Sequence, residues 1–429
     1  MEKIQIERYS SYKYSGVEWL GDIPEHWESR KLKHIFLEKK GKTNPKLNCG
    51  SISFGKVVTK DDEKIPLSTK ASYQEVLKGD FLINPLNLNY DLISLRIALS
   101  EIDVVVSSGY IVINNQIEIN KTYFKWLLHR YDVAYMKLLG SGVRQTINFN
   151  HIANSILVIP PLSEQTNIAN FLDHKTALID QAIGIKEKQI ELLKERRQIL
   201  IHHAVTCGLN PNVKLKDSGV EWIGKIPEHW EIEPIKYSLN GIIDCEHKTA
   251  PFVDEEICFV VRTSNVKEGK LTFDEAKYTH EKGFIEWTQR GIPDPGDVLL
   301  TREAPAGEAC IVPEGTKLCL GQRMVWLKIN KKLVDPQLII YFIYSKIGRT
   351  YIDFLSAGST VLHFNMSDIK NIPIMAMPLD EQNTIVNDLE NVNTKIATSI
   401  SLKEKEIEKL KEYKASLING VVTGKIKVN

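Results

Sequence analysis

The amino-acid sequence predicts an α/β protein with an internal two-fold repeat, in which two similar globular domains are joined by two long antiparallel coiled-coil helices. Three observations predict it: a short segment that occurs twice, two matching heptad-patterned helical segments, and two interiors that mix strand-like and helix-like stretches. A chain of 429 residues is also too long for one ordinary core. We therefore expect a first globular domain at 1–162, a central helix at 163–212, a second globular domain at 213–378 and a C-terminal helix at 379–429.

Each half of the chain opens with nearly the same segment. Residues 15–28 read SGVEWLGDIPEHWE and residues 218–231 read SGVEWIGKIPEHWE, so the copies begin 203 residues apart. His26 and His229 lie in these copies. We expect both to pack and hydrogen-bond at the start of each half, because lone histidines are usually structural.

The two halves also end alike, with PLSEQ from Pro161 and PLDEQ from Pro378. The pattern after Pro161 predicts a helix over 163–206, with Ser163 as N-cap and Gly208 closing its end, and Gly424 closes the second copy. Apolar residues at seven- and three-residue steps form a coiled-coil seam in each copy: Ile183, Ile190, Leu193 and Leu200, then Ile400, Ile407, Leu410 and Leu417, interrupted by Lys186, Arg197, Lys403 and Lys414. A helix of about 40 residues would run roughly 60 Å, and each copy is the obvious partner of the other. The alternative is a pair of amphipathic core helices in one compact domain.

The interiors, at about 29–160 and 232–377, are predicted to be one fold that displays different surfaces. Gly79-Asp80 and Gly296-Asp297 occupy matching places before an apolar run. Strand-like stretches occur in both, and helices are expected over 123–139 and 336–355.

Composition narrows the class of protein. The formal net charge of +1 excludes binding of nucleic acid by bulk charge, so any such surface must be a local patch. The N-terminus lacks the apolar stretch of a signal peptide, and no apolar run is long enough to span a membrane, which favours the cytoplasm. The six cysteines form no CxxC pair, so a zinc site is not expected.

Motifs for nucleotide or methyl-transfer chemistry are incomplete. The stretch 50–57, GSISFGKV, is one residue short of a phosphate-binding loop, because Val57 has no hydroxyl for magnesium. Asn84-Pro85-Leu86-Asn87 lacks the second proline and the aromatic residue of an amino-methyltransferase motif. We interpret the first stretch as a basic loop.

Motifs for nuclease or metal chemistry are incomplete as well. Asp294, Asp297 and Glu303 lack the lysine that a nuclease site needs and are better explained as a turn before a strand. Cys245-Glu246-His247 has no second ligand pair. The sequence therefore predicts no catalytic residues.

These features together resemble the specificity subunit of Type I restriction–modification systems. The resemblance rests on the GVEWLGxIPxHWE opening segment, on the helix from Pro161 with its copy, and on motifs of the second interior. Those motifs are Asp244-Cys-Glu-His-Lys-Thr-Ala-Pro, Arg262-Thr-Ser-Asn-Val, Gly296-Asp-Val-Leu-Leu-Thr-Arg-Glu and Leu320-Gly-Gln. The first interior departs from the pattern and keeps mainly Lys78-Gly79-Asp80 and the stretch from Gly140.

The resemblance implies a non-catalytic, cytoplasmic DNA-recognition subunit with two target-recognition domains, each reading one half of a bipartite site in double-stranded DNA. It implies that the helices act as a ruler between the domains and dock two modification (methyltransferase) subunits. Those partners would use S-adenosylmethionine, and restriction/translocase subunits would use ATP and magnesium. This chain would bind no cofactor itself.

Candidate DNA-binding residues follow from the matched motifs and from the chemistry of base and phosphate recognition. In the second domain they are His247, Lys248, Arg262, Thr263, Asn265, Arg302, Gln322 and Arg323. In the first domain they are Arg96, Arg144, Gln145 and Asn148. The basic tract from Arg30 to Lys46 suits a phosphate-facing loop, with Lys39, Lys40, Lys42 and Lys46 as its contacts, although a solvated surface explains it equally well.

Two other classes of protein stay open on sequence alone. A coiled-coil scaffold that binds proteins would show the same repeated helices. An autonomous nuclease or methyltransferase would need the motifs that are missing.

Overall fold

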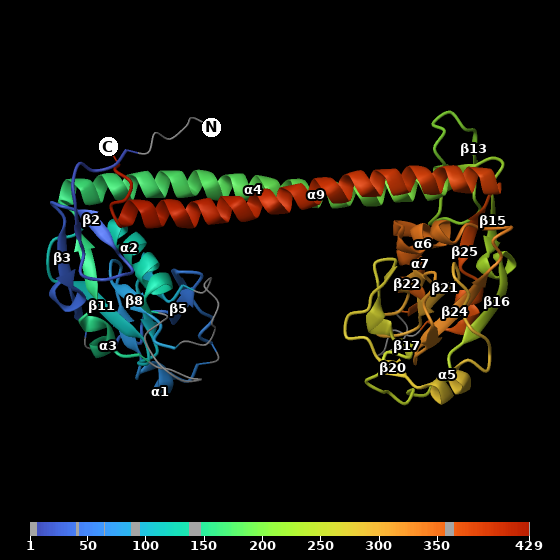
Figure 1. Cartoon of the computed structure of the whole chain (residues 1–429), viewed down its shortest axis with the longest axis horizontal. Helices are drawn as coiled ribbons and strands as arrows, with labels where there is room; N and C mark the ends of the chain where they lie inside the picture. The colour runs from blue at the N-terminus through green and yellow to red at the C-terminus, as the bar shows by residue number, and fades with distance from the viewer. Residues whose placement is uncertain are drawn as a thin grey trace. The chain divides into compact units, whose positions relative to one another are not determined.

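The structure, a computed structural model, describes residues 7–39, 43–63, 65–86, 95–136, 147–356 and 364–428. The chain divides into two compact units. Unit 1 comprises Met1–Lys186 and Lys405–Asn429, and unit 2 comprises Glu187–Glu404. Each unit therefore holds one globular part together with its share of two long helices, α4 (Leu162–Cys207) and α9 (Leu379–Val422) (Figure 1).

The globular part of unit 1 is rich in short strands. In chain order it contains β1 (Tyr12–Tyr14), β2 (Asp22–Pro24), β3 (Glu28–Lys31), η1 (Leu32–His34), β4 (Phe36–Glu38), β5 (Gly50–Ser53), β6 (Lys56–Thr59), α1 (Leu67–Lys70), β7 (Gln74–Val76), β8 (Phe81–Ile83), β9 (Ile97–Leu99), β10 (Val104–Val106), β11 (Ile111–Asn115), α2 (Lys121–Ala134), α3 (Phe149–Ala153) and β12 (Ile156–Ile159).

The globular part of unit 2 follows the same plan with additional elements. It contains β13 (Leu215–Asp217), β14 (Lys225–Pro227), β15 (Glu231–Pro234), η3 (Ile235–Ser238), β16 (Leu239–Asp244), β17 (Cys258–Val261), η4 (Thr263–Asn265), β18 (Val266–Lys267), β19 (Lys270–Leu271), β20 (Tyr278–Thr279), α5 (Glu281–Trp287), β21 (Val298–Thr301), β22 (Ala309–Ile311), β23 (Leu318–Leu320), β24 (Met324–Ile329), α6 (Pro336–Tyr344), α7 (Lys346–Ser356), α8 (Met366–Lys370) and β25 (Pro373–Ala376).

The central sheets of the two units have the same topology. Unit 1 has the antiparallel order β4-β11-β8-β9, and unit 2 has β16-β24-β21-β22 in the same chain sequence. In each unit the strand after the opening segment also pairs with the strand that precedes the long helix, β3 with β12 and β15 with β25. The predicted α/β fold class with an internal two-fold repeat is confirmed.

The repeated Gly-Asp dipeptide builds the same turn in both units. The buried carboxylate of Asp297 accepts hydrogen bonds from the Trp326 indole at 2.7 Å and from the backbone N–H of Ile329 at 2.9 Å. The carboxylate of Asp80, equally buried, accepts from the Lys39 ammonium group and from the Leu77 backbone N–H. The Asp297 N–H also donates to the Asp294 carbonyl at 3.0 Å directly before β21, which confirms that residues 294–297 form a turn into a strand.

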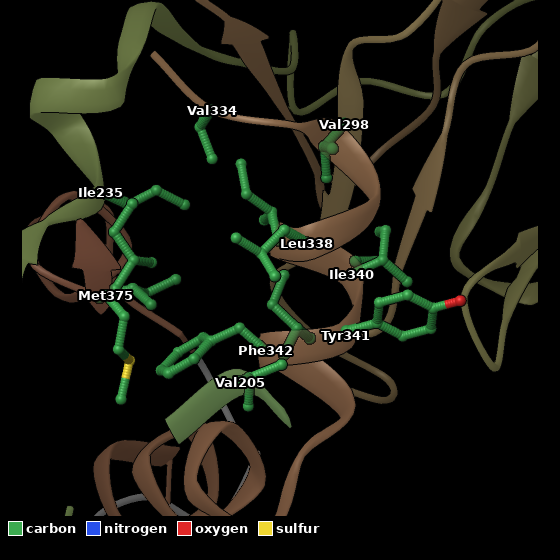
Figure 2. Packing of buried hydrophobic residues seen from close by; sticks show 14 of the residues in the cluster. Val205, Ile235, Val298, Val334, Leu338, Ile340, Tyr341, Phe342 and Met375 are labelled. Atoms are coloured by element: carbon green, nitrogen blue, oxygen red, sulfur yellow. The ribbon is translucent and has the colours of Figure 1, made fainter. Parts of the chain in front are cut away.

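The core of unit 2 lies where its helices meet the sheet and the long helix pair. Figure 2 shows Leu338 and Phe342 of α6 among side chains from other elements, including Val205 of α4, Met375 of β25 and Val298 of β21. All five side chains are at least nine-tenths buried. This cluster thus joins the globular part of unit 2 to its share of the long helices, and further buried clusters lie on the side of β17 and β23.

One predicted helix is broken and another is shorter than expected. The helix expected over 336–355 is two helices, α6 and α7, that meet at Ser345. The Ser345 backbone is extended, and its hydroxyl accepts a hydrogen bond from the Gly348 N–H, which begins the second helix. The helix expected over 123–139 is α2, which ends at Ala134; residues 137–139 lie outside the described residues.

The two long helices pack together in antiparallel fashion, as predicted. In unit 1, Lys414 contacts Asp180 and Lys186 contacts Glu406; in unit 2, Lys403 contacts Gln189 and Arg197 contacts Asn393. The partner's number falls as the α4 number rises, which is the signature of antiparallel helices. The four charged residues that interrupt the apolar seam therefore link the two helices and fix their register.

The predicted N-cap of the first long helix is wrong. α4 begins at Leu162, so Ser163 lies inside the first turn, and the first backbone bond runs from the Gln165 N–H to the carbonyl of Pro161. Proline fixes φ near the value needed at this boundary, which lets the helix start earlier. The predicted ends at Gly208 and Gly424 are confirmed, because both have positive φ just beyond a helix.

The opening segments bind the first turns of the long helices. The Glu164 carboxylate accepts hydrogen bonds from Trp27 Nε1 at 3.0 Å and Tyr9 Oη at 2.9 Å, and it pairs with His26 Nε2 at 2.6 Å. In unit 2, His229 Nε2 lies 2.8 Å from Glu381. The structural role expected for both histidines is confirmed. The opening segment and the start of the long helix bind each other in each unit. This contact explains why the two segments recur together in both halves of the chain.

Glu164→Gln should destabilise the folded chain by about 1–2 kcal/mol at neutral pH, because the charge-assisted hydrogen bonds are lost. Burial raises the pKa of Glu164, but the hydrogen bonds from Trp27, His26 and Tyr9 outweigh it, so the pKa of this carboxyl in the folded chain lies below its usual value. A lowered carboxyl pKa stabilises above the unfolded pKa, and that stabilisation is lost as the pH falls through the folded value. Thermal melts at pH 7 and pH 4 test this. The difference in thermal midpoint between wild type and Glu164→Gln should be smaller at pH 4 than at pH 7. The control Glu191→Gln changes a side chain that is 68% exposed, so its thermal midpoint should equal that of the wild type at both pH values.

Candidate nucleic-acid interface

The strongest candidate site is a hollow in unit 2 at the ends of two neighbouring parallel strands. β17 and β23 run parallel, and their carboxyl ends lead into Arg262-Thr263-Ser264 and Gly321-Gln322-Arg323. These two segments line a cavity of about 180 Å³. The remaining lining residues are Thr249, Ala250, Phe252 and Val260. The hollow thus combines donors, acceptors and one half-exposed aromatic ring, the mixture that reads base edges and thymine methyl groups.

The floor of the hollow depends on a close approach between the two strand ends. The Gly321 N–H donates to the Val261 carbonyl at 2.8 Å, and a Cβ at residue 321 would lie 2.7 Å from that same oxygen. Only glycine fits there. Arg262 lies beside it and donates through Nη2 to the Glu275 carbonyl at 2.7 Å, while its buried Nε has no hydrogen-bond partner among the described residues.

The rim of the hollow carries exposed polar side chains. Gln322 is exposed and donates through Nε2 to the His247 carbonyl at 3.2 Å. Arg323 is exposed, has φ of 67°, and pairs through Nε with Glu303 at 3.0 Å. Lys248 is exposed next to His247. The structure therefore brings the predicted residues of the second domain to one region.

Two of the predicted residues support the hollow from below. Asn265 is fully buried; its side chain accepts from the Arg262 N–H and donates to the Asp274 carbonyl. Arg302 is 8% exposed and donates to Asp244 Oδ2 at 2.7 Å. Their side chains position the loops, and contact between them and a base stays a prediction.

One group of metal-capable side chains lies at the same rim. Ligand atoms of Asp244, Cys245 and His247 all fall within 4.8 Å of one another. The Asp244 carboxylate, however, already accepts from Arg302 and lies 3.0 Å from His247 Nε2, while His247 Nδ1 faces Cys245 Sγ at 3.8 Å. The two ring nitrogens thus have different partners, which fix the orientation of the imidazole on a residue whose φ is 55°.

Those predicted residues of the first domain that the structure describes do not form a comparable group. Lys39 donates to buried Asp80 at 2.7 Å, and exposed Asn148 caps α3 by accepting from the His151 N–H. Lys46 is exposed. Lys40, Lys42, Arg144 and Gln145 lie outside the described residues.

Arg96 occupies a buried position with a structural partner. It is 5% exposed, and its Nε donates to Asp132 of α2 at 3.1 Å. Unit 2 has the reversed pair at the same place: Glu308, which precedes β22 as Arg96 precedes β9, binds Arg349 of α7 at 2.9 Å. The matching position of the two pairs indicates that Arg96 ties strand to helix.

The basic tract of the first domain is not one phosphate-facing loop, contrary to the sequence interpretation. Arg30 lies on β3 and pairs with Glu28 at 2.6 Å, and the tract continues through η1 and β4. Lys31 lies on β3 and Lys33 in η1, whereas Lys39 and Lys46 lie in the connection between β4 and β5, and Lys40 and Lys42 lie outside the described residues. A phosphate-facing loop therefore stays a prediction for the second part of the tract alone.

The phosphate-loop-like stretch is also not the basic loop expected. Residues 50–53 and 56–59 form the antiparallel hairpin β5–β6. No helix follows β5 directly to offer an N-terminus to a phosphate, which is the arrangement that such a loop needs.

Sequence reasoning missed several residues of the hollow. Phe252, Thr249 and Ser264 line it but were not singled out. Phe252 directly follows the Asp244–Pro251 motif, and Thr249 lies within it, so the motif itself could have indicated both.

The cysteines behave as small apolar side chains. All are free thiols, and five are buried; Cys207 is partly exposed. Burial raises the pKa of Cys310 to about 12, so its thiol is neutral. No helix in the described part of the chain has both the length and the apolar character that a membrane crossing demands.

Comparison with known proteins gives a consistent result. Residues 24–195 and 239–412 each match the model of the type I restriction modification DNA specificity domain. The chain is 26% identical over 446 residues to a Methanocaldococcus jannaschii protein assigned as the MjaX type I restriction enzyme specificity subunit, covering 99% of both. It is 24% identical over 289 residues to the Escherichia coli EcoBI specificity subunit, covering 64% of this chain and 59% of that one.

Solved structures share the fold. A chain from a study of complex assembly and conformational transition in the type I R-M system matches with a TM-score of 0.70 at 15% identity, over 93% of this chain and 98% of that one. The HsdS subunit from Thermoanaerobacter tengcongensis matches with a TM-score of 0.53 at 15% identity, over 94% of this chain and 98% of that one.

Proposed function

Because this chain belongs to the type I restriction–modification DNA specificity family, we propose that it is the DNA-reading subunit of such a complex. Each unit reads one half of a bipartite site in double-stranded DNA. The chain performs no catalysis itself, and the two long helices set the spacing of the half-sites. As a subunit that reads DNA, it works in the cytoplasm.

The observation that carries this proposal is the hollow of unit 2. It gathers Thr263, Gln322 and Arg323 at the ends of adjacent parallel strands, where exposed amide, hydroxyl and guanidinium groups can contact base edges. The matching scaffold of unit 1 displays different residues at its strand ends. Two similar scaffolds with different surfaces suit recognition of two different half-sites.

The catalytic steps belong to partner subunits in this proposal. Two modification subunits would dock on the long helices and methylate adenine with S-adenosylmethionine. Restriction/translocase subunits would use ATP and magnesium. We propose that this chain contributes only binding and geometry, and that it holds no cofactor.

Selection of binding sites from random duplexes tests the proposal, using the chain co-expressed with its modification subunit at near-physiological salt. We expect two short fixed motifs around a constant gap. Selection of no motif, with DNA retained only at low salt, would leave a protein-binding scaffold as the better explanation.

The same assay tests the hollow. Thr263→Ala combined with Gln322→Ala should relax one half-site, leave the other unchanged and weaken binding about tenfold, because each removes a donor and an acceptor from base reach. The matched control is Lys332→Ala, an exposed residue at the opposite end of β24 from Gln322. Equal relaxation by the control, or an unchanged half-site in the double variant, would contradict the assignment.

A further inference from the structure

The hairpin β5–β6 of unit 1 ends in an exposed aromatic residue. Ser53 pairs with Lys56, so Phe54 and Gly55 form a two-residue connection, and both have positive φ, 47° and 73°. Such a turn favours Asn-Gly or Asp-Gly. Phe54 is nevertheless the first residue of the turn and is 88% exposed, more than any other large apolar side chain among the described residues.

The fold does not explain this phenylalanine. A bulky side chain at positive φ is unfavourable, and an exposed ring gains nothing from packing. Gly55 is different, because a Cβ there would come within 2.7 Å of the Leu95 side chain. Packing and the positive φ of 73° therefore both favour glycine at residue 55, whereas phenylalanine at residue 54 has two costs and no intramolecular benefit.

The position of the hairpin matches the hollow of unit 2. Cys49, just before β5, bridges in parallel to Val105 of β10, as β17 runs parallel to β23 in unit 2. In unit 2 the chain beyond this parallel pairing lines the hollow, and in unit 1 it forms the hairpin that carries Phe54. Exposed Lys56 lies next to the tip and exposed Lys60 lies at the base of the hairpin opposite Cys49, and both suit a phosphate backbone.

We infer that Phe54 is a base-stacking wedge, which places its ring against or between the bases of the half-site read by unit 1. This inference rests on the proposed DNA-reading function. Apolar side chains that insert at a base step unstack it and kink the duplex, most easily at pyrimidine–purine steps. The ring would thus read the deformability of the step rather than its hydrogen-bonding groups.

Unit 2 provides a natural comparison. Its hairpin β18–β19 has the same pair of positive φ angles at the tip, 49° at Glu268 and 83° at Gly269. The tip residue there is acidic, and its N–H donates to Glu308 at 3.0 Å. Unit 2 therefore has no aromatic wedge at this tip, and the two half-sites are read by different means.

The substitution Phe54→Asn separates a DNA-contacting role from a structural one. Asparagine suits the turn better than phenylalanine, so the thermal midpoint of the complex should stay constant or rise. Affinity for the selected duplex should fall about tenfold, while Phe54→Trp should retain it. The matched control Glu268→Asn makes the same turn exchange in unit 2 and should not reduce affinity.

A fluorescent adenine analogue, 2-aminopurine, placed along the unit 1 half-site reports unstacking directly. Its fluorescence should rise at one step with the unaltered complex and not with Phe54→Asn. A lower thermal midpoint for Phe54→Asn, or unchanged affinity and fluorescence, would overturn the wedge. If the unaltered complex binds DNA without sequence preference, both the proposed function and the wedge are wrong. If the unaltered complex binds selectively and Phe54→Asn binds equally well, only the wedge is wrong.

Discussion

Replacing Leu192 and Ile199 of α4 with glutamate should weaken the binding of the modification subunit by about 100-fold. Both side chains are exposed, at 51% and 58%, although both are large and apolar. Completing the burial of each contributes about 1 kcal/mol, and a buried glutamate adds a desolvation cost, so the pair should cost about 3 kcal/mol.

The prediction follows from where these residues lie on the helix. Leu178, Ile185, Leu192 and Ile199 recur every seven residues along α4, and all four are exposed by 47–58%. Each lies two residues beyond a seam position such as Ile183 or Ile190, which is about 200° around a helix. α4 therefore has one apolar face against α9 and a second face on its other side. A helix that is apolar on two faces needs a second partner.

α9 supplies the matched control. The residues that correspond to the exposed row are Lys395, Leu402, Lys409 and Ser416, of which only Leu402 is apolar. Leu402→Glu should have a much smaller effect than the double variant on α4. Binding is measured by titrating purified modification subunit against the labelled chain. Docking on this row would be contradicted if both variants lost the same affinity for the modification subunit. It would also be contradicted if the α4 variant kept both its helix content and its full affinity.

The long helices were predictable because their determinants are local. The seven-residue pattern, the Gly208 end and the repeated copy were enough to predict both helices and their antiparallel pairing. The start was missed by one residue, since Pro161 and Ser163 both suit a helix boundary and only the bonds made by Glu164 and Gln165 decide between them.

The candidate site was less predictable because it depends on pairing between distant strands. Residues 262–264 and 321–323 meet because β17 and β23 run side by side, and periodicity does not reveal that pairing. For the same reason, arginines selected as base contacts included Arg96, which is a buried partner of Asp132. Residue type alone does not separate an arginine that reads DNA from one that ties a strand to a helix.

The unfavourable position of Phe54 could not be predicted from the sequence either. GSISFGKV reads as a near match to a phosphate-binding loop, and Phe54 attracts no notice within it. Its importance depends on two structural facts, its positive φ and its exposure, which only the hairpin reveals.

Removing seven residues from each long helix should change the preferred spacer and leave both half-site motifs intact. The deletion takes residues 187–193 from α4 and 399–405 from α9. The contacts Lys186–Glu406 and Arg197–Asn393 are kept, and the contact Gln189–Lys403 is removed as a pair. Because both helices lose the same number of residues, the seam keeps its register on either side.

Seven residues shorten a helix by about 10 Å and rotate it by only about 20°. On DNA this length is about three base pairs, which correspond to a rotation of roughly 100°. A gap shorter by about three base pairs would match the new length, but it would turn one half-site away from its unit, because the DNA rotates far more than the helices do. We expect site selection to return a changed gap that balances length against rotation, and affinity for the original site to fall about 100-fold, because one unit can no longer engage its half-site in register.

The substitution pair Gln189→Ala and Lys403→Ala is the control for this deletion, because it removes the same contact without changing the length. It should leave the selected gap unchanged. A deletion variant that folds, binds DNA and still selects the original gap would show that the helices do not set the spacing. Changed half-site motifs would instead mean that the helices shape the reading surfaces themselves. The experiment therefore separates the preferred spacer length from the half-site sequence preference. The spacer length depends on the helix residues that are removed, and the sequence preference depends on strand ends that the deletion does not change.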